Sequence, residues 1–375
     1  MLCTGARILL ESLKREGVDL FFGYPGGAVI DIYDELSNHP DLRHILVRHE
    51  QGAVHAADGY ARACGKVGVC LATSGPGATN TVTGIATAYS DSIPMVIFTG
   101  QVSTPLIGND AFQEVDIIGI TRPCTKHNFL VKDVKDLAET VRKAFYLARS
   151  GRPGPVLVDI PKNIQQASCE FVWPEDVVMR SYCPTFRANL NQLRRAMDVL
   201  VTSRKPLIVA GGGVIMANAA EELCTLAHLM HAPVCSTLMG LGAFPGDDPL
   251  WIGMLGMHGT FAANRAVTQA DVILAVGARF DDRVTGKLSQ FAPNARIVHI
   301  DIDPTTLRKN VRVEVPVVSD ALSALQGLRS ILESGHAQKD WAGDHADWMG
   351  QVLEWQKEHP LSWAKGDVLK PQQVV

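Results

Sequence analysis

The sequence has no excess of positive charge, no long apolar run and no secretory signal pattern. Its formal net charge is -4 over 375 residues. Nucleic acids and anionic membranes are bound by basic surfaces, and a membrane-spanning helix needs roughly 18 apolar residues in a row. The opening residues lack a basic segment followed by an apolar one. We therefore expect a cytoplasmic protein without a nucleic-acid or membrane partner.

The eight cysteines also lack the spacing of a metal site. No two of them are spaced as C-x-x-C, and no paired Cys/His set of the zinc-binding kind is visible in the sequence. Several lie within apolar runs, such as Cys70 and Cys235. We expect reduced cysteines that act as small core residues, and no metal ligands.

The length and composition are those of a soluble protein with two or three domains. Hydrophobic residues make up 46% and charged residues 20% of the sequence. The first 165 residues alternate short apolar runs with amphipathic stretches, which is typical of a parallel α/β sheet. We predict helices at 52–63 and 137–148, and strands that are buried on both faces at 20–22, 45–47, 67–72, 95–99 and 156–160.

A second α/β pattern follows a polar, irregular stretch that contains Pro174 and Pro184. Its predicted strands are 207–210, 234–236, 272–276, 297–302 and 315–318. After about His336 the chain indicates a helix and then a tail, in which Pro371 resembles the first residue of a further helix. The predicted fold class is α/β, with two consecutive open parallel-sheet domains at 1–165 and 191–340, the second Rossmann-like. We interpret 166–190 as a linker and 341–375 as a linker to a further domain.

Glu50 is the first candidate for a chemical role. It directly follows a predicted strand and precedes a helix of small residues. Ligands of open α/β sheets bind at the carboxyl ends of strands, and a buried carboxyl can share a proton with a ligand nitrogen. The alternative is a helix-start glutamate that only complements the helix dipole. The motif alone does not decide between them.

Three further segments of the first domain are ambiguous by themselves. The glycine-rich turn 74–80 follows a strand and opens a helix, so its N–H groups can meet a ligand or merely make a tight connection. The loop 110–114 mixes polar and aromatic residues. Arg152, in a loop of glycine and proline, can clamp a phosphate or lie at the surface.

Glycines and paired charges follow the strands of the second domain. The run 211–213 suits close backbone approach to a nucleotide but does not match G-x-G-x-x-G. Segment 277–283 has two Arg and two Asp within five residues, as recognition of an anion and a ribose would use. His258 alone is more typical of a loop histidine. Asp301 and Asp303 can accept ribose hydroxyls; a Mg²⁺ site is the alternative, without a third ligand nearby in sequence.

Together and in this order, segments 22–27, 48–51, 73–80, 110–114, 150–155, 255–259 and 277–283 resemble one family. The chain is similar, over essentially all 375 residues, to the large catalytic subunit of acetohydroxyacid synthase (acetolactate synthase), and looks closest to the enterobacterial isozyme III type. Enzymes of this family join two 2-ketoacids, pyruvate with pyruvate or 2-ketobutyrate, for branched-chain amino acid biosynthesis. Their cofactors are thiamine diphosphate, FAD and Mg²⁺.

The resemblance implies roles for individual residues. Residues 1–165 would be the pyrimidine-binding domain for thiamine diphosphate, with Glu50 activating the cofactor through a hydrogen bond to its aminopyrimidine ring. Gly26, Phe112, Gln113 and Lys162 would line the reacting centre, and Arg279 would help to accept the second ketoacid. Residues 191–340 would be the central FAD-binding domain. The cofactor-contacting positions would be Tyr24, Pro25, Glu50, Pro76, Asn80, Arg152, Gly211, Gly212, Gly213, Thr237, Leu238, Leu255, Gly256, Met257, His258, Gly259, Gly277, Ala278, Arg279, Asp281, Arg283, Asp301, Ile302 and Asp320.

One family motif is absent from these 375 residues. The family's third domain carries a Gly-Asp-Gly motif that helps to hold Mg²⁺ and the diphosphate, and the sequence has none. The family's site forms between the pyrimidine domain of one subunit and the diphosphate domain of another, which implies a homodimer, and a small regulatory subunit is a further partner. We expect a truncated chain that is inactive alone. The alternative is a non-catalytic FAD-binding remnant that pairs with intact subunits. Another thiamine enzyme, such as an oxidase or a glyoxylate carboligase, is a third interpretation; a carboligase of that kind is expected to lack the activating glutamate, and Glu50 is present.

Overall fold

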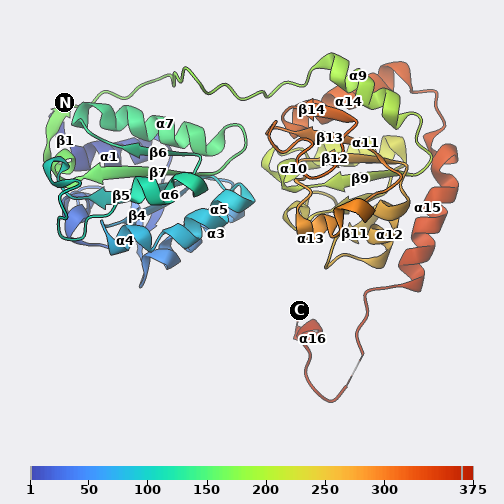
Figure 1. The fold of residues 1–375 in the computed structure, drawn as a ribbon, viewed down its shortest axis with the longest axis horizontal. Helices are drawn as coiled ribbons and strands as arrows, with labels where there is room; N and C mark the ends of the chain where they lie inside the picture. The colour runs from blue at the N-terminus through green and yellow to red at the C-terminus, as the bar shows by residue number, and fades with distance from the viewer. Residues whose placement is uncertain (1, 365, 375) are drawn as a thin grey trace. The chain divides into compact units, whose positions relative to one another are not determined.

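The structure is a computed structural model that describes residues 2–364 and 366–374, in two compact units. Unit 1 is Met1–Cys183 and unit 2 is Pro184–Val375 (Figure 1). The division lies within the stretch that the sequence indicates as a linker. Among the described residues, no helix is long and apolar enough to cross a membrane.

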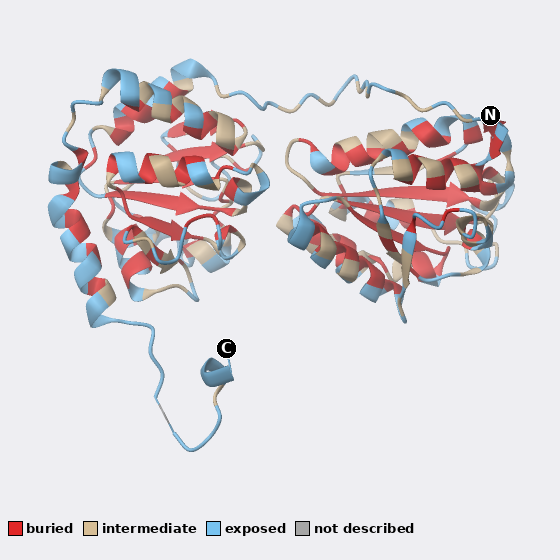
Figure 2. Cartoon of the chain, turned by 180° about the vertical axis from the view of Figure 1, so that it is seen from behind, coloured by how far each residue is buried: buried red, intermediate tan, exposed pale blue. Residues whose placement is uncertain are grey.

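Unit 1 is built on a six-stranded parallel sheet with the order β3-β2-β4-β5-β7-β6. Its central strands β4, β5 and β7 are buried at every position, as Figure 2 shows. A small antiparallel sheet pairs the strands β1 and β8, with Cys3 opposite Cys169. The bounds are β1 Leu2–Thr4, β2 Leu20–Gly23, β3 Arg43–Leu46, β4 Gly68–Ala72, β5 Met95–Gln101, β6 His127–Leu130, β7 Pro155–Pro161 and β8 Ser168–Glu170.

Helices cover both faces of the unit 1 sheet (Figure 1). One face packs against α1 (Gly5–Arg15), α2 (Ile30–Leu36) and α7 (Leu137–Arg149), whose apolar side chains form one core with the strands. The other face contacts α3 (Glu50–Cys64), which packs beside α5 (Val82–Asp91). Small residues such as Ala53 and Ala57 let α3 approach the sheet closely, since both are fully buried. The short helices are α4 (Pro76–Thr79), α6 (Ile117–Thr121) and α8 (Lys162–Gln166).

Unit 2 contains a second six-stranded parallel sheet, with the order β11-β10-β9-β12-β13-β14. Numbered along this unit, that order is 3-2-1-4-5-6, the Rossmann arrangement. The Rossmann-like expectation is therefore confirmed. The strands are β9 (Pro206–Ala210), β10 (Val234–Ser236), β11 (Trp251–Met254), β12 (Val272–Val276), β13 (Arg296–Asp301) and β14 (Val315–Val318).

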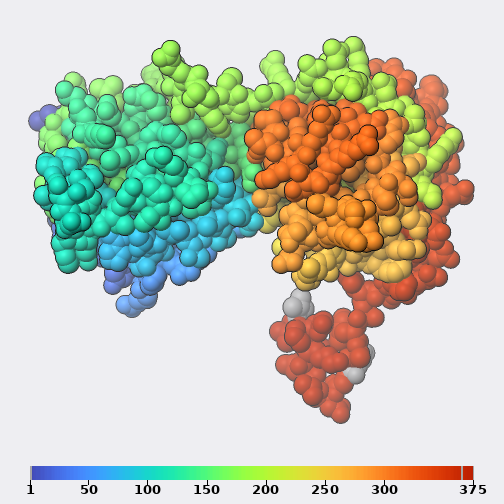
Figure 3. Space-filling model, in the orientation of Figure 1, coloured from blue at the N-terminus to red at the C-terminus, as the bar shows by residue number. Residues whose placement is uncertain are grey.

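The helices of unit 2 also form two layers. One core combines the sheet with α9 (Leu190–Leu200), α11 (Ala220–Met230) and α14 (Ala321–Gly335), and the other with α12 (Phe261–Gln269) and α15 (Trp341–Glu358). In the space-filling view of Figure 3, side chains fill the space between the elements of each unit. The short helices are α10 (Gly212–Met216), α13 (Asp282–Thr285) and α16 (Pro371–Val374). The last begins at Pro371, as the sequence indicates.

The edge strands are where sequence and structure differ most. All ten predicted strands are present. The edge strands β6 and β11, and the short strands β1 and β8 of the small sheet, are not among the predicted ones. The prediction that every strand is buried on both faces is wrong for β3, whose Leu46 is 58% exposed. An edge strand has a neighbour on one side only, so it needs no continuous apolar run. The two predicted helices are confirmed as α3 and α7, with α3 starting two residues earlier.

Both predicted linkers contain ordered structure. In 166–190, β8 pairs with β1, and the Tyr182 hydroxyl donates a 2.8 Å hydrogen bond to the carbonyl oxygen of Ser150. In 341–375, α15 buries Trp341, Trp348 and Trp355. The indole Nε1 of Trp348 donates to the carbonyl oxygen of Pro206 at 2.8 Å. Residues 341–358 thus belong to the core of unit 2, because their tryptophans lie on the face turned toward it.

Candidate functional site

The candidate site of unit 1 lies where its strand order reverses. From β2 the sheet continues to β3 on one side and to β4 on the other, so the turns that follow β2 and β4 meet at one crevice. The Tyr24 N–H donates to the carbonyl oxygen of Leu71 at 3.2 Å. A Cβ added to Gly26 would lie 2.5 Å from the Cβ of Thr73. A side chain at Gly26 would therefore force these two turns apart.

Glu50 is the first residue of α3 and lies next to this crevice. Only 8% of its surface is exposed, and its Oε2 accepts a 2.9 Å hydrogen bond from Nδ2 of Asn80. Burial raises the pKa of the Tyr33 hydroxyl and of the Cys70 thiol, and the charge of Glu50 raises both further. The two interpretations of Glu50 are thus compatible in geometry. It starts a helix, and its carboxylate is also held by a second segment of the site.

A glycine faces the other oxygen of this carboxylate. A Cβ at Gly77 would lie 3.1 Å from Oε1 of Glu50 and 2.6 Å from Cγ2 of Thr73. Thr73 in turn accepts a 3.2 Å hydrogen bond from the N–H of Ala28 through its Oγ1. The residues around the carboxylate are therefore closely packed. The carboxylate fits among them because residue 77 is a glycine and has no side chain.

The loop 110–114 contacts the same turn. Gly75 has a φ of +56°, and a Cβ there would lie 2.5 Å from the carbonyl oxygen of Gln113. Gln113 itself has a φ of +56°. The backbone is therefore in the left-handed region on both sides of this close contact. The side chain of Phe112 is 87% exposed and therefore available to a ligand or partner.

Lys162 comes to the crevice from the end of β7. Its Nζ donates a 2.8 Å hydrogen bond to the carbonyl oxygen of Gly27 and lies 3.5 Å from Oδ2 of Asp31. Arg152 is held elsewhere in unit 1, where its Nε donates to Oγ of Ser92 at 2.8 Å. The structure thus brings Glu50, Gly26, Asn80, Gln113 and Lys162 to neighbouring turns and ties Arg152 to a different loop. Tyr24, Pro25 and Pro76 lie in the same turns and are exposed.

Unit 2 has its own crevice at the point where its strand order reverses, between β9 and β12. A Cβ at Gly213 would lie 2.7 Å from the Cα of Gly277, and the Gly211 N–H donates to the carbonyl oxygen of Val276 at 2.8 Å. Only glycines allow the two turns to pass so closely. The hydroxyl of Ser236, at the end of β10, is buried without a hydrogen-bond partner among the described residues. A polar ligand is one way to satisfy that hydroxyl.

Two further candidate segments of unit 2, 255–259 and 277–283, are joined by a backbone hydrogen bond. The Met257 N–H donates to the carbonyl oxygen of Arg283 at 2.8 Å. Asp281 and Asp320 cap helices: Asp281 accepts from the N–H of Arg283 at 3.0 Å, and Asp320 from that of Leu322 at 3.0 Å. Both acidic residues therefore have a structural role. The side chains of Leu238, Met257 and His258 are exposed, whereas Thr237, Arg279 and Ile302 are half-buried.

Asp301 ends β13 and is mostly buried. Its Oδ1 accepts a 2.8 Å hydrogen bond from the N–H of Asp303, and its Oδ2 lies 3.9 Å from Nε2 of His299. Burial lowers the pKa of His299 to about 4, so this histidine is neutral at pH 7. The Asp301 carboxylate thus stabilises the turn that follows β13 through its hydrogen bond with Asp303.

Sequence reasoning missed two polar groups. Asp159 on β7 is buried, and burial raises its pKa to about 7. It accepts hydrogen bonds from Oγ1 of Thr99 at 2.7 Å and Nε2 of Gln101 at 3.0 Å. In the sequence, this group is indicated by a carboxylate within a predicted apolar strand.

The second group is Cys224, His228 and Asp248, whose possible ligand atoms lie within 4.8 Å of one another. Its signal is a Cys and a His four residues apart on a helix, and it departs from our expectation of no ligand set.

Comparison with known proteins shows which class of enzyme has these two domains. Residues 3–120 match the thiamine pyrophosphate enzyme N-terminal TPP binding domain, and residues 193–328 match the central domain of the same enzymes. The first match contains Glu50 and Asn80, and the second contains Gly211 and Gly277. The chain belongs to the thiamine pyrophosphate enzyme family.

Within that family the chain is similar to acetolactate synthase large subunits. It is 49% identical to the acetolactate synthase large subunit of Haemophilus influenzae and 50% identical to the acetolactate synthase isozyme 3 large subunit of Escherichia coli. It is also 49% identical to a probable acetolactate synthase large subunit of Methanocaldococcus jannaschii. Each comparison covers 99% of this chain, but only 65%, 65% and 62% of the respective relative. The resemblance seen in the sequence is confirmed.

Proposed function

We propose that the chain acts as an acetolactate synthase large subunit, which joins two 2-ketoacids in branched-chain amino acid biosynthesis. The substrates would be pyruvate with pyruvate or with 2-ketobutyrate. The buried Glu50 carboxylate carries the proposal, because it is held by Asn80 at a sheet crevice of a TPP binding domain. We also propose a cytoplasmic location, with FAD and Mg²⁺ as further cofactors. The chain spans 65% of the length of its relatives in Haemophilus influenzae and Escherichia coli, so this activity is proposed for a protein with the full length of those relatives.

The crevice of unit 1 fits the aminopyrimidine ring of thiamine diphosphate. When bound, this cofactor supplies the carbanion chemistry of the reaction. Glu50 would hold a proton shared with a ring nitrogen, and burial would exclude water from that hydrogen bond. Asn80 would keep the carboxylate in place through Oε2, which leaves Oε1 toward Gly77. The exposed Phe112 would shape the ketoacid pocket, with Gln113 and Lys162 as polar neighbours.

The crevice of unit 2 would hold FAD. Its glycines allow close backbone approach, and the unpartnered hydroxyl of Ser236, opposite Ala210 at the end of β9, offers a hydrogen bond. Arg279 would pair with the carboxylate of the second ketoacid. Asp281 and Asp320 already cap helices, so we assign them an indirect role that shapes the FAD-binding loops.

The site would be completed by partner chains. A homodimer through the pyrimidine-binding domain would bring the diphosphate-binding part of another subunit to Glu50, and a small regulatory subunit would bind in addition. The Mg²⁺ ligands would lie in that diphosphate-binding part, since no Gly-Asp-Gly occurs in these 375 residues.

A complementation assay tests this proposal. A full-length relative, with Gln in place of its counterpart of Glu50, would be mixed with this chain, pyruvate, thiamine diphosphate, Mg²⁺ and FAD. The chain should restore acetolactate formation, because it supplies the missing carboxylate across the dimer interface. The Glu50→Gln chain should not restore it, although Gln can still accept the hydrogen bond of Asn80.

Flavin absorbance of the purified chain gives an independent reading of unit 2. It should be equal for the natural chain and for Glu50→Gln. Flavin binding without any rescue would favour the alternative function, an FAD-binding chain that pairs with intact subunits. Equal rescue by both chains would overturn the role of Glu50.

A further inference from the structure

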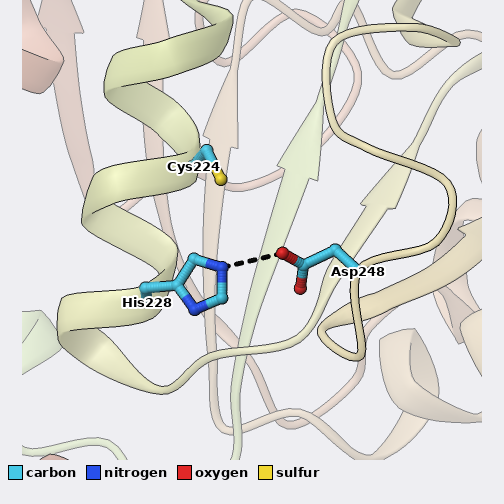
Figure 4. A group of neighbouring side chains, drawn as sticks. All are labelled: Cys224, His228 and Asp248. Atoms are coloured by element: carbon cyan, nitrogen blue, oxygen red, sulfur yellow. Dashed lines mark hydrogen bonds and ion pairs between the residues drawn. The ribbon is translucent and has the colours of Figure 1, made fainter.

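Three side chains with metal-binding atoms meet on unit 2, away from the crevice of that unit. Cys224 and His228 lie one turn apart on α11, so they project from the same face of the helix. Asp248 comes from the segment between β10 and β11 (Figure 4). One ligand atom of each residue lies within 4.8 Å of the other two, and Nε2 of His228 is 2.8 Å from Oδ2 of Asp248.

The backbone around Asp248 holds its carboxylate in place. Oδ1 accepts a 2.9 Å hydrogen bond from the N–H of Leu250, and the Asp248 carbonyl oxygen accepts one from Trp251 at 2.9 Å. The Leu250 bond leaves Oδ2 directed at His228. In metal sites such a second hydrogen bond typically orients a ligating carboxylate.

The other two side chains are also positioned by packing. The ring of His228 stacks on Phe244, with centroids 6.5 Å apart and an interplanar angle of 23°. Cys224 is partly buried and packs against the core formed by α9, α11 and α14. Asp248 is 13% exposed and His228 is 49% exposed, so solvent reaches the group from the His228 side. A cation can therefore approach the group from solvent on that side.

We propose that Cys224, His228 and Asp248 bind a divalent cation of the zinc class. Zinc prefers thiolate, imidazole and carboxylate ligands, at about 2.3 Å for sulfur and about 2.0–2.2 Å for nitrogen and oxygen. In a tetrahedron of these lengths the ligand atoms lie roughly 3.5 Å apart. The ligand atoms now lie within 4.8 Å of one another, so binding would require the side chains to rotate toward that spacing. The fourth position would be filled by water, since three protein ligands leave one open.

The cation would take the place of the proton between His228 and Asp248. It would connect α11 to the segment that leads into β11, two elements that the contact between His228 and Asp248 already links. None of the three residues is among those proposed for thiamine diphosphate, FAD or the ketoacids. The metal-site proposal is therefore tested independently of the proposed function.

The simpler interpretation is a surface ion pair of His228 with Asp248. Such half-exposed pairs contribute little to stability. That interpretation gives Cys224 no part, whereas the metal site requires its thiolate. The thiol is thus the residue that separates the two interpretations.

Cobalt binding to the full chain provides the test. Co²⁺ replaces Zn²⁺ in such sites, and its thiolate charge-transfer band reports a bond to sulfur. The chain would be kept reduced with a phosphine that does not chelate metals. We expect one Co²⁺ per chain with a tetrahedral spectrum, displaced by Zn²⁺. Cys224→Ser should abolish the charge-transfer band, and His228→Gln and Asp248→Asn should each weaken binding by at least roughly tenfold.

Two matched controls exclude adventitious binding. Cys183→Ser removes an exposed thiol outside the group, and His231→Asn removes a histidine three residues from His228, at a φ of +48° that Asn tolerates. Both variants should bind Co²⁺ like the natural chain. Zn²⁺ should raise the melting temperature of the natural chain and of both controls, but not of Cys224→Ser. A charge-transfer band that survives Cys224→Ser, or disappears in Cys183→Ser, would overturn the proposal. So would the absence of any Co²⁺ binding by the folded natural chain.

Discussion

The side-chain amide of Asn80 donates a 2.9 Å hydrogen bond to the carboxylate of Glu50, thirty residues earlier in the chain. The bond joins the start of α3 to the C-cap of α4, the short helix that follows β4. Hydrogen bonds to charged groups contribute about 1.5–3 kcal/mol. In a double-mutant cycle of Glu50→Ala and Asn80→Ala, we expect a coupling free energy of about 1–3 kcal/mol, measured by urea unfolding.

The neighbouring residue Gln51 provides the control for this cycle. Its side chain is exposed, so Gln51→Ala should show no coupling with Asn80→Ala. A coupling near zero for Glu50 as well would mean that Asn80 does not stabilise the carboxylate.

Gly77 gives a second prediction about the same carboxylate. In Gly77→Ala the new Cβ would lie 2.6 Å from Cγ2 of Thr73 and 3.1 Å from Oε1 of Glu50. We expect a loss of about 1–3 kcal/mol in the free energy of unfolding, as for other overpacked sites. Thr73→Ser removes the clashing methyl group and keeps the hydroxyl, so the double variant should recover part of this loss.

Gly59 is a matched glycine for which the opposite sign is expected. It lies within α3, and a Cβ there would meet no atom within 4 Å. Gly59→Ala should stabilise the chain by about 0.5–1 kcal/mol, because alanine favours the helix interior. If both substitutions had the same sign, crowding at Gly77 would not be the cause.

All strands in the middle of each sheet could be predicted from the sequence, whereas only one edge strand of each sheet, β3 and β14, could be predicted. The run that forms β12 is apolar at every position and the run that forms β5 at its first four, because both faces of these strands are covered. The segments that became β6 and β11 are short and carry polar or glycine residues. They become strands only because a neighbouring strand offers hydrogen bonds along its length.

The sequence indicates the candidate site residues one by one, but it does not indicate the contacts between them. A strand-end position and a glycine-rich turn suggested Glu50 and the region of Asn80 separately. Their hydrogen bond depends on α3 lying beside the β4 turn, which no local pattern encodes. Asp248 likewise lies twenty residues after His228 in sequence, and only the β10–β11 connection brings it back to α11.

The buried carboxyl of Asp159 predicts a pH dependence. Its pKa is raised to about 7 in the folded chain by burial, against about 3.9 in an unfolded chain. Between these values the folded state holds a proton that the unfolded state has lost. The free energy of unfolding should therefore fall as the pH rises from about 4 to about 7, by at most about 1.4 kcal/mol per pH unit, and level off above.

Asp159→Asn should flatten this part of the stability profile. The Asn amide can donate to Thr99 while its oxygen accepts from Gln101, as a protonated carboxyl would. Urea unfolding at several pH values provides the measurement. Asp34→Asn, at an exposed position on α2, should leave the natural pH dependence unchanged. An unchanged slope in Asp159→Asn would assign the dependence to other groups.

Helix α15 gives the last prediction, since it decides where unit 2 ends. It buries Trp341, Trp348 and Trp355, and Trp348 donates a hydrogen bond to Pro206. A chain that ends at His359 keeps the helix and should unfold like the natural chain. A chain that ends at Lys339 should lose at least about 3–5 kcal/mol, the cost of removing a single buried tryptophan. Circular dichroism during urea unfolding suits the comparison, because the two chains differ in tryptophan content. Equal unfolding transitions for both chains would mean that residues 341–358 do not stabilise unit 2 and act as a linker.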